Sequence, residues 1–260
     1  MRRPAAIRAA WLTAAAILCL LTAGCQMDPG AGKIRNTMFI GVDTSGSFKD
    51  SGYYDNAIKF LARYIHAHLN GYGGATKPHA LFVGSVGGRT HDEPKTFHPI
   101  HDFQGKSINK IERQLLEWFA AEDTLTDFNA FFEEVARITK QRNLVLSPIT
   151  ILLVSDGKPD FASSVRKGKT TRELYSKINL APLEYLSRNI TLRLTYPSPT
   201  VAKFWRKSVP RERVRLWTVD GEVMKRWPDY IQPNVGSANQ VRFLSWMKDN
   251  VDFKVRAKRI

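Results

Sequence analysis

Runs of apolar residues along the chain follow two spacings, one typical of strands and the other of helices. Continuous apolar segments, such as ITILLVS at 149–155, are typical of strands buried on both faces of a sheet. A short edge strand is expected at 95–98, joined to the strand before it by a turn at Gly87 and Gly88. With this edge strand, the pattern predicts six strands, at 37–43, 79–86, 95–98, 149–155, 190–195 and 214–219.

Between these strands, apolar residues recur at the spacing of a helix. Ala57, Ile58, Leu61 and Ile65 recur at the spacing of an amphipathic helix at 53–69. Further helices are predicted at 107–120 with Ser107 as N-cap, 127–140, 171–187 with an interruption at Pro182, 201–207 and 240–250. Strands that alternate with helices predict an α/β fold with a doubly wound, mainly parallel six-stranded sheet and helices on both faces.

The composition is that of a globular protein, with 43% hydrophobic and 24% charged residues among 260. The two cysteines, Cys19 and Cys25, both lie near the N-terminus, which excludes a disulfide or a cysteine zinc site in the rest of the chain. The net charge is +15, and about +12 remains after 1–24 are removed, from 36 basic and 24 acidic residues. This charge favours anionic neighbours such as phospholipid head groups or an acidic protein.

The first 24 residues have the pattern of an export signal. Arg2, Arg3 and Arg8 precede an apolar run at 9–23, which is shorter than the ~20 residues of a membrane-spanning helix. The run ends LTAGC at Cys25, which resembles a bacterial lipobox, although Thr22 stands where Leu is commoner. The resemblance implies a lipoprotein signal peptide at 1–24 and a diacylglycerol, with fatty acids such as palmitate, on Cys25.

Residues 25–35 then form the lipidated cysteine and a polar tether. The tether QMDPGAGKIR reaches only ~18 Å if it is flexible, so the domain at 36–260 is expected to stay close to the membrane. Gln26 follows the cysteine in place of Asp, which by resemblance to enterobacterial sorting favours the periplasmic face of the outer membrane over the inner membrane.

Three separated segments carry oxygen-bearing side chains at positions where predicted strands end or helices begin. Residues 43–47 read DTSGS after the first strand, Thr126 and Asp127 open a helix, and Asp156 with Gly157 follows the strand at 149–155. Loops after parallel strands gather at the carboxyl edge of a sheet, where ligands bind at the point at which the strand order reverses. We therefore expect these side chains to lie together.

These segments resemble the metal-ion-dependent adhesion site of von Willebrand factor A domains, which have a Rossmann-like sheet. Asp43, Ser45 and Ser47 match the first loop of that site, Thr126 matches the second and Asp156 the third. The resemblance covers about 36–220, with a last helix at about 240–250. It implies that these five residues bind a divalent metal.

The ligand chemistry supports the same expectation. Carboxylate and hydroxyl oxygens are hard ligands that suit Mg²⁺ or Mn²⁺. Two carboxylates and three hydroxyls leave a coordination position that a carboxylate of a partner can fill, and Gly46 is expected to let the first loop turn tightly. The predicted function is a non-enzymatic envelope lipoprotein that captures an acidic group of a protein partner through this metal, with no nucleic-acid partner.

Two alternatives remain open from the sequence. The same metal could serve an enzyme that polarises a phosphate or activates water, although no motif places a general base beside it. The chain could instead be a structural protein whose basic surface, including 158–177, binds anionic glycan or lipid. A second metal site is also conceivable at His91, His98 and His101, with Asp92 and Asp102.

Overall fold

The computed structural model describes residues 36–88, 90, 93, 95–120, 125–161 and 163–253, which belong to one compact unit, Arg35–Ile260. The predicted signal peptide, Cys25 and the tether lie outside the described residues, as do His91 and Asp92. Among the described residues, no helix combines the length and apolar character that are needed to cross a bilayer.

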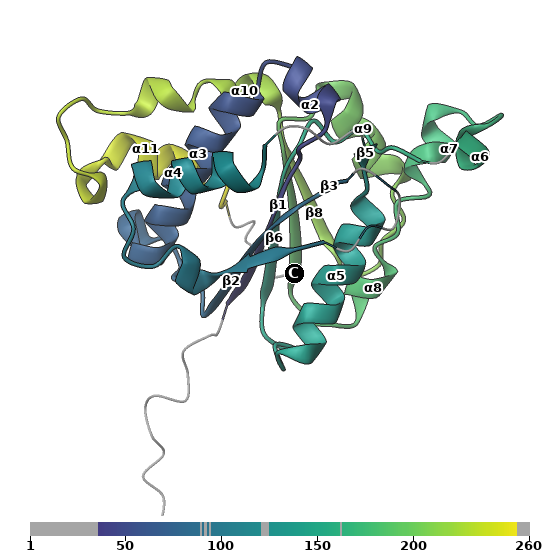
Figure 1. The fold of residues 1–260 in the computed structure, drawn as a ribbon, viewed down its shortest axis with the longest axis horizontal. Helices are drawn as coiled ribbons and strands as arrows, with labels where there is room; N and C mark the ends of the chain where they lie inside the picture. The colour runs from purple at the N-terminus through teal and green to yellow at the C-terminus, as the bar shows by residue number, and fades with distance from the viewer. Residues whose placement is uncertain are drawn as a thin grey trace, which may run out of the picture. The chain divides into compact units, whose positions relative to one another are not determined.

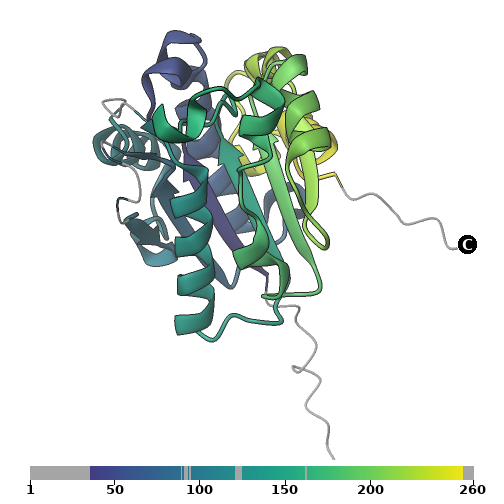
Figure 2. The same ribbon diagram turned by 90° about the vertical axis from the view of Figure 1, so that its right-hand side faces the viewer.

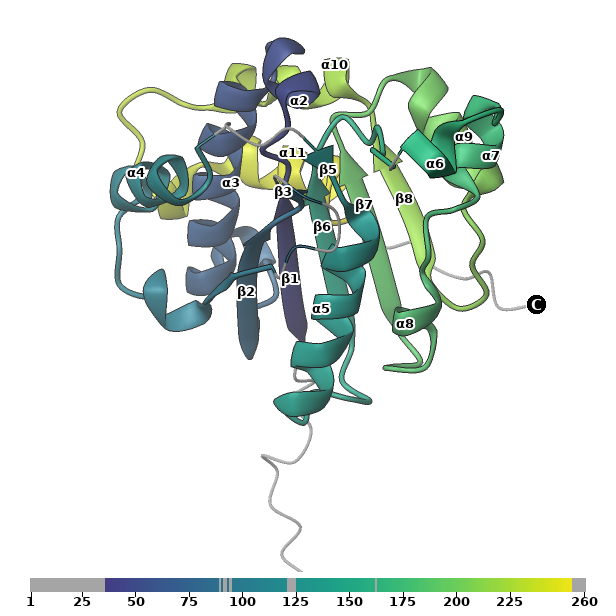
Figure 3. The ribbon, with the colours of Figure 1, turned by 45° about the vertical axis from the view of Figure 1, so that its right-hand side comes forward.

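A six-stranded sheet forms the centre of this unit, with the strand order β4-β2-β1-β6-β7-β8. All neighbouring strands are parallel except β2 and β4, so the prediction of a mainly parallel six-stranded α/β sheet is confirmed. The parallel strands begin at one edge of the sheet, the amino edge, and end at the other, the carboxyl edge, near α2 and α10 (Figure 3). The strands are β1 (Thr37–Val42), β2 (Ala80–Ser85), β4 (Phe97–Pro99), β6 (Ile149–Val154), β7 (Ile190–Thr195) and β8 (Arg215–Val219).

Two very short strands form a separate antiparallel pair. Gly87 and Gly88 make up β3 and do not simply form the predicted turn, because they pair with β5 (Leu125–Thr126). The buried ammonium of Lys95 donates a hydrogen bond of 2.7 Å to the carbonyl of Gly87. This pairing was not predictable from local spacing, because it joins segments about forty residues apart.

Helices cover both faces of the sheet (Figure 1). One buried cluster includes residues of α3, α4 and α11, and the other includes residues of α5, α8 and α9. Figure 2 shows the layer that contains α5 from the front. The helices are α2 (Gly46–Asp50), α3 (Tyr54–Asn70), α4 (Ile108–Trp118), α5 (Phe128–Gln141), α6 (Ser163–Arg166), α7 (Thr171–Tyr175), α8 (Ala181–Glu184), α9 (Pro199–Ser208), α10 (Gly221–Lys225) and α11 (Val241–Asn250).

The central strand β1 is buried along its whole length because helices cover both of its faces. Met38 and Ile40 join the cluster under α3, whereas Phe39 joins the cluster under α5. A Cβ at Gly41 would come within 2.8 Å of the Phe131 ring, so α5 packs directly on the backbone of β1 at this position.

One predicted helix differs from the structure, two short helices were not predicted, and the predicted N-cap residue Ser107 is confirmed in position. The helix expected at 171–187 is two short helices, α7 and α8, and the break precedes Pro182, which lies in the first turn of α8. The helices α2 and α10 were not predicted, because five residues are too few to show an apolar period. Ser107 is the N-cap residue of α4, but its side chain makes no capping hydrogen bond.

A polar cluster anchors the segment after α11 to the rest of the fold. Asp252 accepts a hydrogen bond of 2.8 Å from the Tyr64 hydroxyl and lies 2.9 Å from Nε2 of His68. Arg193 of β7 donates to the carbonyls of Val251 and Phe253. The C-terminal helix is therefore attached at its end to both α3 and the sheet.

Candidate functional site

The candidate metal site lies at the carboxyl edge, where β1 and β6 end side by side. The strand order changes direction here, since β2 lies on one side of β1 and β6 on the other. Val42 is level with Val154, and the backbone N–H of Asp43 donates 2.9 Å to the carbonyl of Val154. This register places Asp43 next to Ser155, although 112 residues separate them.

Asp43 is completely buried, and the described groups that donate hydrogen bonds to it are neutral. Its Oδ2 accepts a hydrogen bond of 2.5 Å from the Ser155 hydroxyl, and its Oδ1 accepts one of 3.0 Å from the Ser45 N–H. The Thr126 hydroxyl lies 3.5 Å from Oδ1, which is a weak contact. The first and second loops thus meet at one carboxylate.

Burial raises the pKa of Asp43 from 3.8 to about 6, because the ionised form loses its hydration. The hydrogen bonds from Ser155 and Ser45 oppose this rise, and the negative charge of Asp156 adds to it. Among the described charged groups, no cation offsets the burial of Asp43. A buried carboxylate in this state favours a bound cation.

Ser45 and Ser47 occupy the turn into α2. Their hydroxyl oxygens lie 3.3 Å apart, with Ser45 buried and Ser47 exposed, so the site is open to solvent on the side of α2. The expectation that Gly46 provides conformational freedom is not supported. Gly46 begins α2, its φ is not positive, and a Cβ there would meet nothing within 4 Å.

Thr126 is held in place by the third loop. Its N–H donates to Oδ2 of Asp160 at 3.3 Å, and its carbonyl accepts from the N–H of Asp160 at 3.0 Å. The pairing of Thr126 with Gly87 fixes the other side of the residue. Thr126 is fully buried, and its hydroxyl faces Oδ1 of Asp43.

Asp156 already has a positively charged partner. Its Oδ1 accepts a hydrogen bond of 3.1 Å from the N–H of Lys158, and its Oδ2 lies 2.8 Å from the Lys158 Nζ. The Asp156 side chain is nearly buried, whereas 57% of the Lys158 side chain is exposed. Because Lys158 can move away into solvent, Asp156 remains available to a metal.

Gly157 fixes the course of the third loop. Its φ is +77°, and its carbonyl accepts a hydrogen bond of 2.7 Å from the indole nitrogen of Trp205 in α9. A Cβ at this position would lie 2.8 Å from Cδ2 of Leu194. Only glycine satisfies both the backbone conformation and the packing.

The donor set at this edge fits a hard divalent ion. Asp43, Ser45 and Thr126 share hydrogen bonds around one carboxylate, Ser47 is adjacent, and the charge of Asp156 acts on Asp43. In the described part of the chain, no group of three or more His, Cys, Asp or Glu side chains could hold a metal. A metal at this site would therefore depend on the hydroxyl oxygens, which suits Mg²⁺ or Mn²⁺.

The conceivable histidine site does not take shape in the described residues. His98 stacks on Trp118, with ring centroids 3.7 Å apart, and its Nδ1 lies 3.7 Å from Asp102. Burial lowers the pKa of His98, and the carboxylate of Asp102 opposes this shift. His98 therefore has a structural role in packing β4 against α4.

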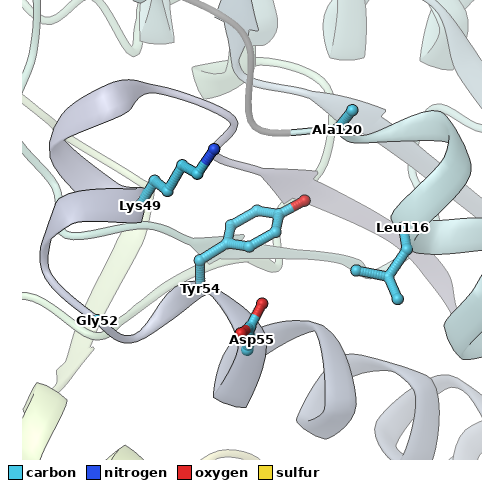
Figure 4. A pocket seen from close by; sticks show the side chains of 6 residues that line it. All are labelled: Lys49, Gly52, Tyr54, Asp55, Leu116 and Ala120. Atoms are coloured by element: carbon cyan, nitrogen blue, oxygen red, sulfur yellow. The ribbon is translucent and has the colours of Figure 1, made fainter.

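A pocket of about 340 Å³ lies beside α2, and none of the five predicted ligands lines it. Figure 4 shows Lys49 and Leu116 on opposite sides of the Tyr54 ring. Lys49, two residues after Ser47, lines this pocket and so belongs to a different part of the surface from the predicted ligands.

Sequence reasoning missed three residues of this site. Ser155 and Asp160 make the hydrogen bonds that join the loops, and Lys158 was assigned only to a basic rim. The sequence did hold one signal, since a serine, two carboxylates and a lysine lie together in SDGKPD directly after a strand. Nothing in the spacing showed which of them face Asp43 or Thr126.

No protein-family model and no curated protein matches the sequence. Among solved structures, the chain is similar to proximal thread matrix protein 1 from the mussel byssus, with 12% identity and a TM-score of 0.42 over 81% of this chain and 48% of that chain. The human COPII-coat protein Sec24c matches at 9% identity and a TM-score of 0.43, over 74% and 32%. The open conformation of the pilus adhesin SpaC from Lactobacillus rhamnosus GG matches at 9% and 0.47, over 84% and 31%. The chain spans less than half of each protein.

Proposed function

We propose that this chain is a lipid-anchored envelope protein whose von Willebrand A-type domain, with a doubly wound sheet, binds Mg²⁺ or Mn²⁺ and captures an acidic group of a protein partner. Asp43, Ser45, Ser47, Thr126 and Asp156 would hold the metal. The lipid would be attached to Cys25, and the periplasmic face of the outer membrane is the expected location. No catalytic step is assigned to the site.

The observation that supports this proposal best is the burial of the Asp43 carboxylate without a described cation to compensate its charge. Asp43 is a fully buried carboxylate beside a second carboxylate, and the described groups that donate hydrogen bonds to it are neutral, which is unfavourable without a cation. The exposed Ser47 leaves one side of the site open. A metal there would keep a coordination position for a carboxylate from outside the chain.

The test is a pull-down from envelope extract with the full-length chain, in Mg²⁺ and then in chelator. Asp43→Ala and Thr126→Ala are expected to abolish capture. The matched controls Asp249→Ala and Thr200→Ala change exposed residues of α11 and α9 and should retain it. A site variant that no longer binds Mg²⁺ in calorimetry but still captures the partner would refute the bridging role.

The same samples separate the alternatives. Capture that falls with added salt but is indifferent to chelator would favour the structural reading, in which the basic surface binds anionic glycan or lipid. Metal-dependent hydrolysis of a phosphate ester would favour the alternative in which the metal site is that of an enzyme. The anchor is tested by fatty-acid labelling, which Cys25→Ser should eliminate.

A further inference from the structure

The amino edge of the sheet, at the opposite end from the candidate metal site, exposes three large apolar side chains. Leu146 is 81% exposed, Tyr185 is 73% exposed and Val145 is 40% exposed. The N–H of Leu146 donates 2.8 Å to the carbonyl of Leu186, so the loop before β6 and the loop before β7 lie side by side. The three residues therefore lie on neighbouring loops at this edge, and together they are called the apolar patch below.

The backbone holds Leu146 in an unfavourable conformation that keeps it exposed. Its φ is +70°, in the left-handed region that a branched side chain rarely adopts. Its neighbours Leu144 and Leu186 are packed into the core under α5. A leucine that protrudes from a strained turn between anchored neighbours indicates a contact surface.

Basic residues lie along the same edge of the sheet as this patch. The guanidinium of Arg213 lies 5.2 Å from the centre of the Tyr185 ring. The described loops that precede β2, β6, β7 and β8 contain one exposed carboxylate, Glu212. The exposed cations described at this edge are Lys77, Lys140, Arg142, Arg188, Arg213 and Arg215.

The chain also enters the domain at this edge. The carbonyl of Asn36 accepts from the N–H of His79 at 2.8 Å, and the N–H of Thr37 donates to Pro148 at 2.9 Å. Asn36 thus lies between the loops before β2 and β6, and Pro148 is two residues from Leu146. An anchor at Cys25 would be joined to the domain next to the apolar patch.

We propose that Val145, Leu146, Tyr185 and the six cations form a membrane-docking surface that binds a bilayer containing phosphatidylglycerol. The apolar side chains would enter the interface, while the cations bind the anionic head groups. The metal site at the carboxyl edge then faces away from the membrane, toward a partner. This inference rests on the proposed function only for the lipid anchor at Cys25.

The test uses the full-length chain with Leu146→Cys, purified from cells in detergent, labelled with an environment-sensitive fluorophore and reconstituted into vesicles. Val223→Cys is the matched control, because Val223 is a partly exposed valine of α10 at the carboxyl edge. A blue shift is expected at position 146 in vesicles of phosphatidylethanolamine with phosphatidylglycerol, and none at 223. Phosphatidylethanolamine alone should give a smaller shift, because it lacks the anionic head group.

Charge reversal tests the cations separately. Arg142→Glu, Arg188→Glu and Arg213→Glu together should abolish the shift at position 146. The control Lys167→Glu, Arg172→Glu and Lys177→Glu makes the same change in net charge among exposed residues after the third loop, and should keep the shift. If the first combination does not fold, the comparison of 146 with 223 still decides the proposal.

Several outcomes would overturn docking. One is that the fluorophores at 146 and 223 are equally exposed to water on anionic vesicles. Another is that the blue shift at 146 is lost in the control charge-reversal combination and kept in the first one. A shift at 146 that requires added envelope protein would mean that a protein, not lipid, occupies the surface. The mass of the purified chain reports whether Cys25 carries a lipid. Chelator and Asp43→Ala should leave the shift unchanged, so failure of metal-dependent capture is distinguishable from failure of docking.

Discussion

The Lys158 Nζ lies 2.8 Å from Oδ2 of Asp156, so the chain itself supplies a cation to one of the two carboxylates of the candidate metal site. Among the described residues, those that donate hydrogen bonds to Asp43, the other carboxylate, do so through neutral groups. The two carboxylates therefore differ in what a metal must displace. At Asp43 a bound metal would compensate a buried negative charge, whereas at Asp156 it would compete with the ammonium of Lys158.

Replacing Lys158 by Gln should tighten Mg²⁺ binding. The lysine is more than half exposed, so its ion pair contributes ~0.2–1 kcal/mol, which corresponds to a decrease in Kd of up to about fivefold. Isothermal titration calorimetry measures this effect, with Lys167→Gln as a control for the loss of one charge. An unchanged or weakened affinity would show that Asp156 does not bind the metal.

Asp43→Asn should hold or raise the stability of the metal-free protein at neutral pH. The pKa of Asp43 rises from 3.8 to about 6 on folding, so its contribution to stability is complete below pH 3.8 and is lost as the pH rises through 6. At pH 7 in chelator the variant should gain up to ~3 kcal/mol in the free energy of unfolding, since each unit of the pKa rise corresponds to about 1.4 kcal/mol.

Denaturant unfolding at pH 4 and pH 7 tests this prediction, with Asp249→Asn as the exposed control. Mg²⁺ should stabilise the wild type and not the variant, because an ion that binds only the folded state adds RT ln(1 + [L]/Kd). Loss of stability of Asp43→Asn in chelator would indicate that its hydrogen bonds with Ser155 and Ser45 outweigh its burial.

The pair formed by His68 and Asp252 should make stability depend on pH. Burial opposes the charge of His68, but Asp252 outweighs it and raises the pKa of His68 above 6.5. Burial likewise opposes the charge of Asp252, but His68 and Arg193 outweigh it and lower the pKa of Asp252 below 3.8. The stabilisation is therefore complete between these two values, is lost above pH 6.5 as His68 deprotonates, and is lost below 3.8 as Asp252 becomes protonated.

A double-mutant cycle with His68→Gln and Asp252→Asn should give a coupling energy of about 1.5–3 kcal/mol at pH 5, the range for hydrogen bonds to charged groups. The coupling should be smaller at pH 8.5. Equal coupling at the two pH values would mean that His68 is neutral throughout and that the contact is an ordinary hydrogen bond.

Gly157→Ala should destabilise the protein more than Gly168→Ala. Both glycines have a positive φ, +77° and +72°, so both substitutions carry a conformational cost of about 1–2 kcal/mol. A Cβ at 157 would also clash with Leu194 and Trp205, whereas one at 168 meets nothing within 4 Å. Overpacking adds about 1–3 kcal/mol. Thermal unfolding of the two variants isolates this difference, and equal melting temperatures would show that the third loop shifts freely.

The apolar pattern predicted the strands well because burial on both faces leaves a simple signal in the sequence. The strand predicted at 190–195 agrees with β7, and the helix predicted at 240–250 differs from α11 by one residue. The edge strand predicted at 95–98 lies at Phe97–Pro99, because a half-exposed strand of three residues has no clear period. The helices α2 and α10 left no periodic signal because each has only five residues.

For the candidate site, the sequence by itself determined the residue types and their order: Asp43, Ser45, Ser47, Thr126 and Asp156, each at the end of a strand or the start of a helix. Whether they bind metal stays a prediction. Only the tertiary structure decided which groups contact them. The Ser155 hydroxyl reaches Asp43 because β1 and β6 pair in one register, and a shift by one residue would point the side chain to the other face.

The same reason explains how the residues of the proposed membrane-docking surface come together. Leu146, Tyr185 and Arg213 lie in separate segments of the sequence and are unremarkable there, and they come to the same edge because the parallel strands begin there. Local spacing determines which side chains an element buries, since that depends on residues within a few turns of each other. Contacts between elements depend on strand order and register, which are set by the packing of the whole domain.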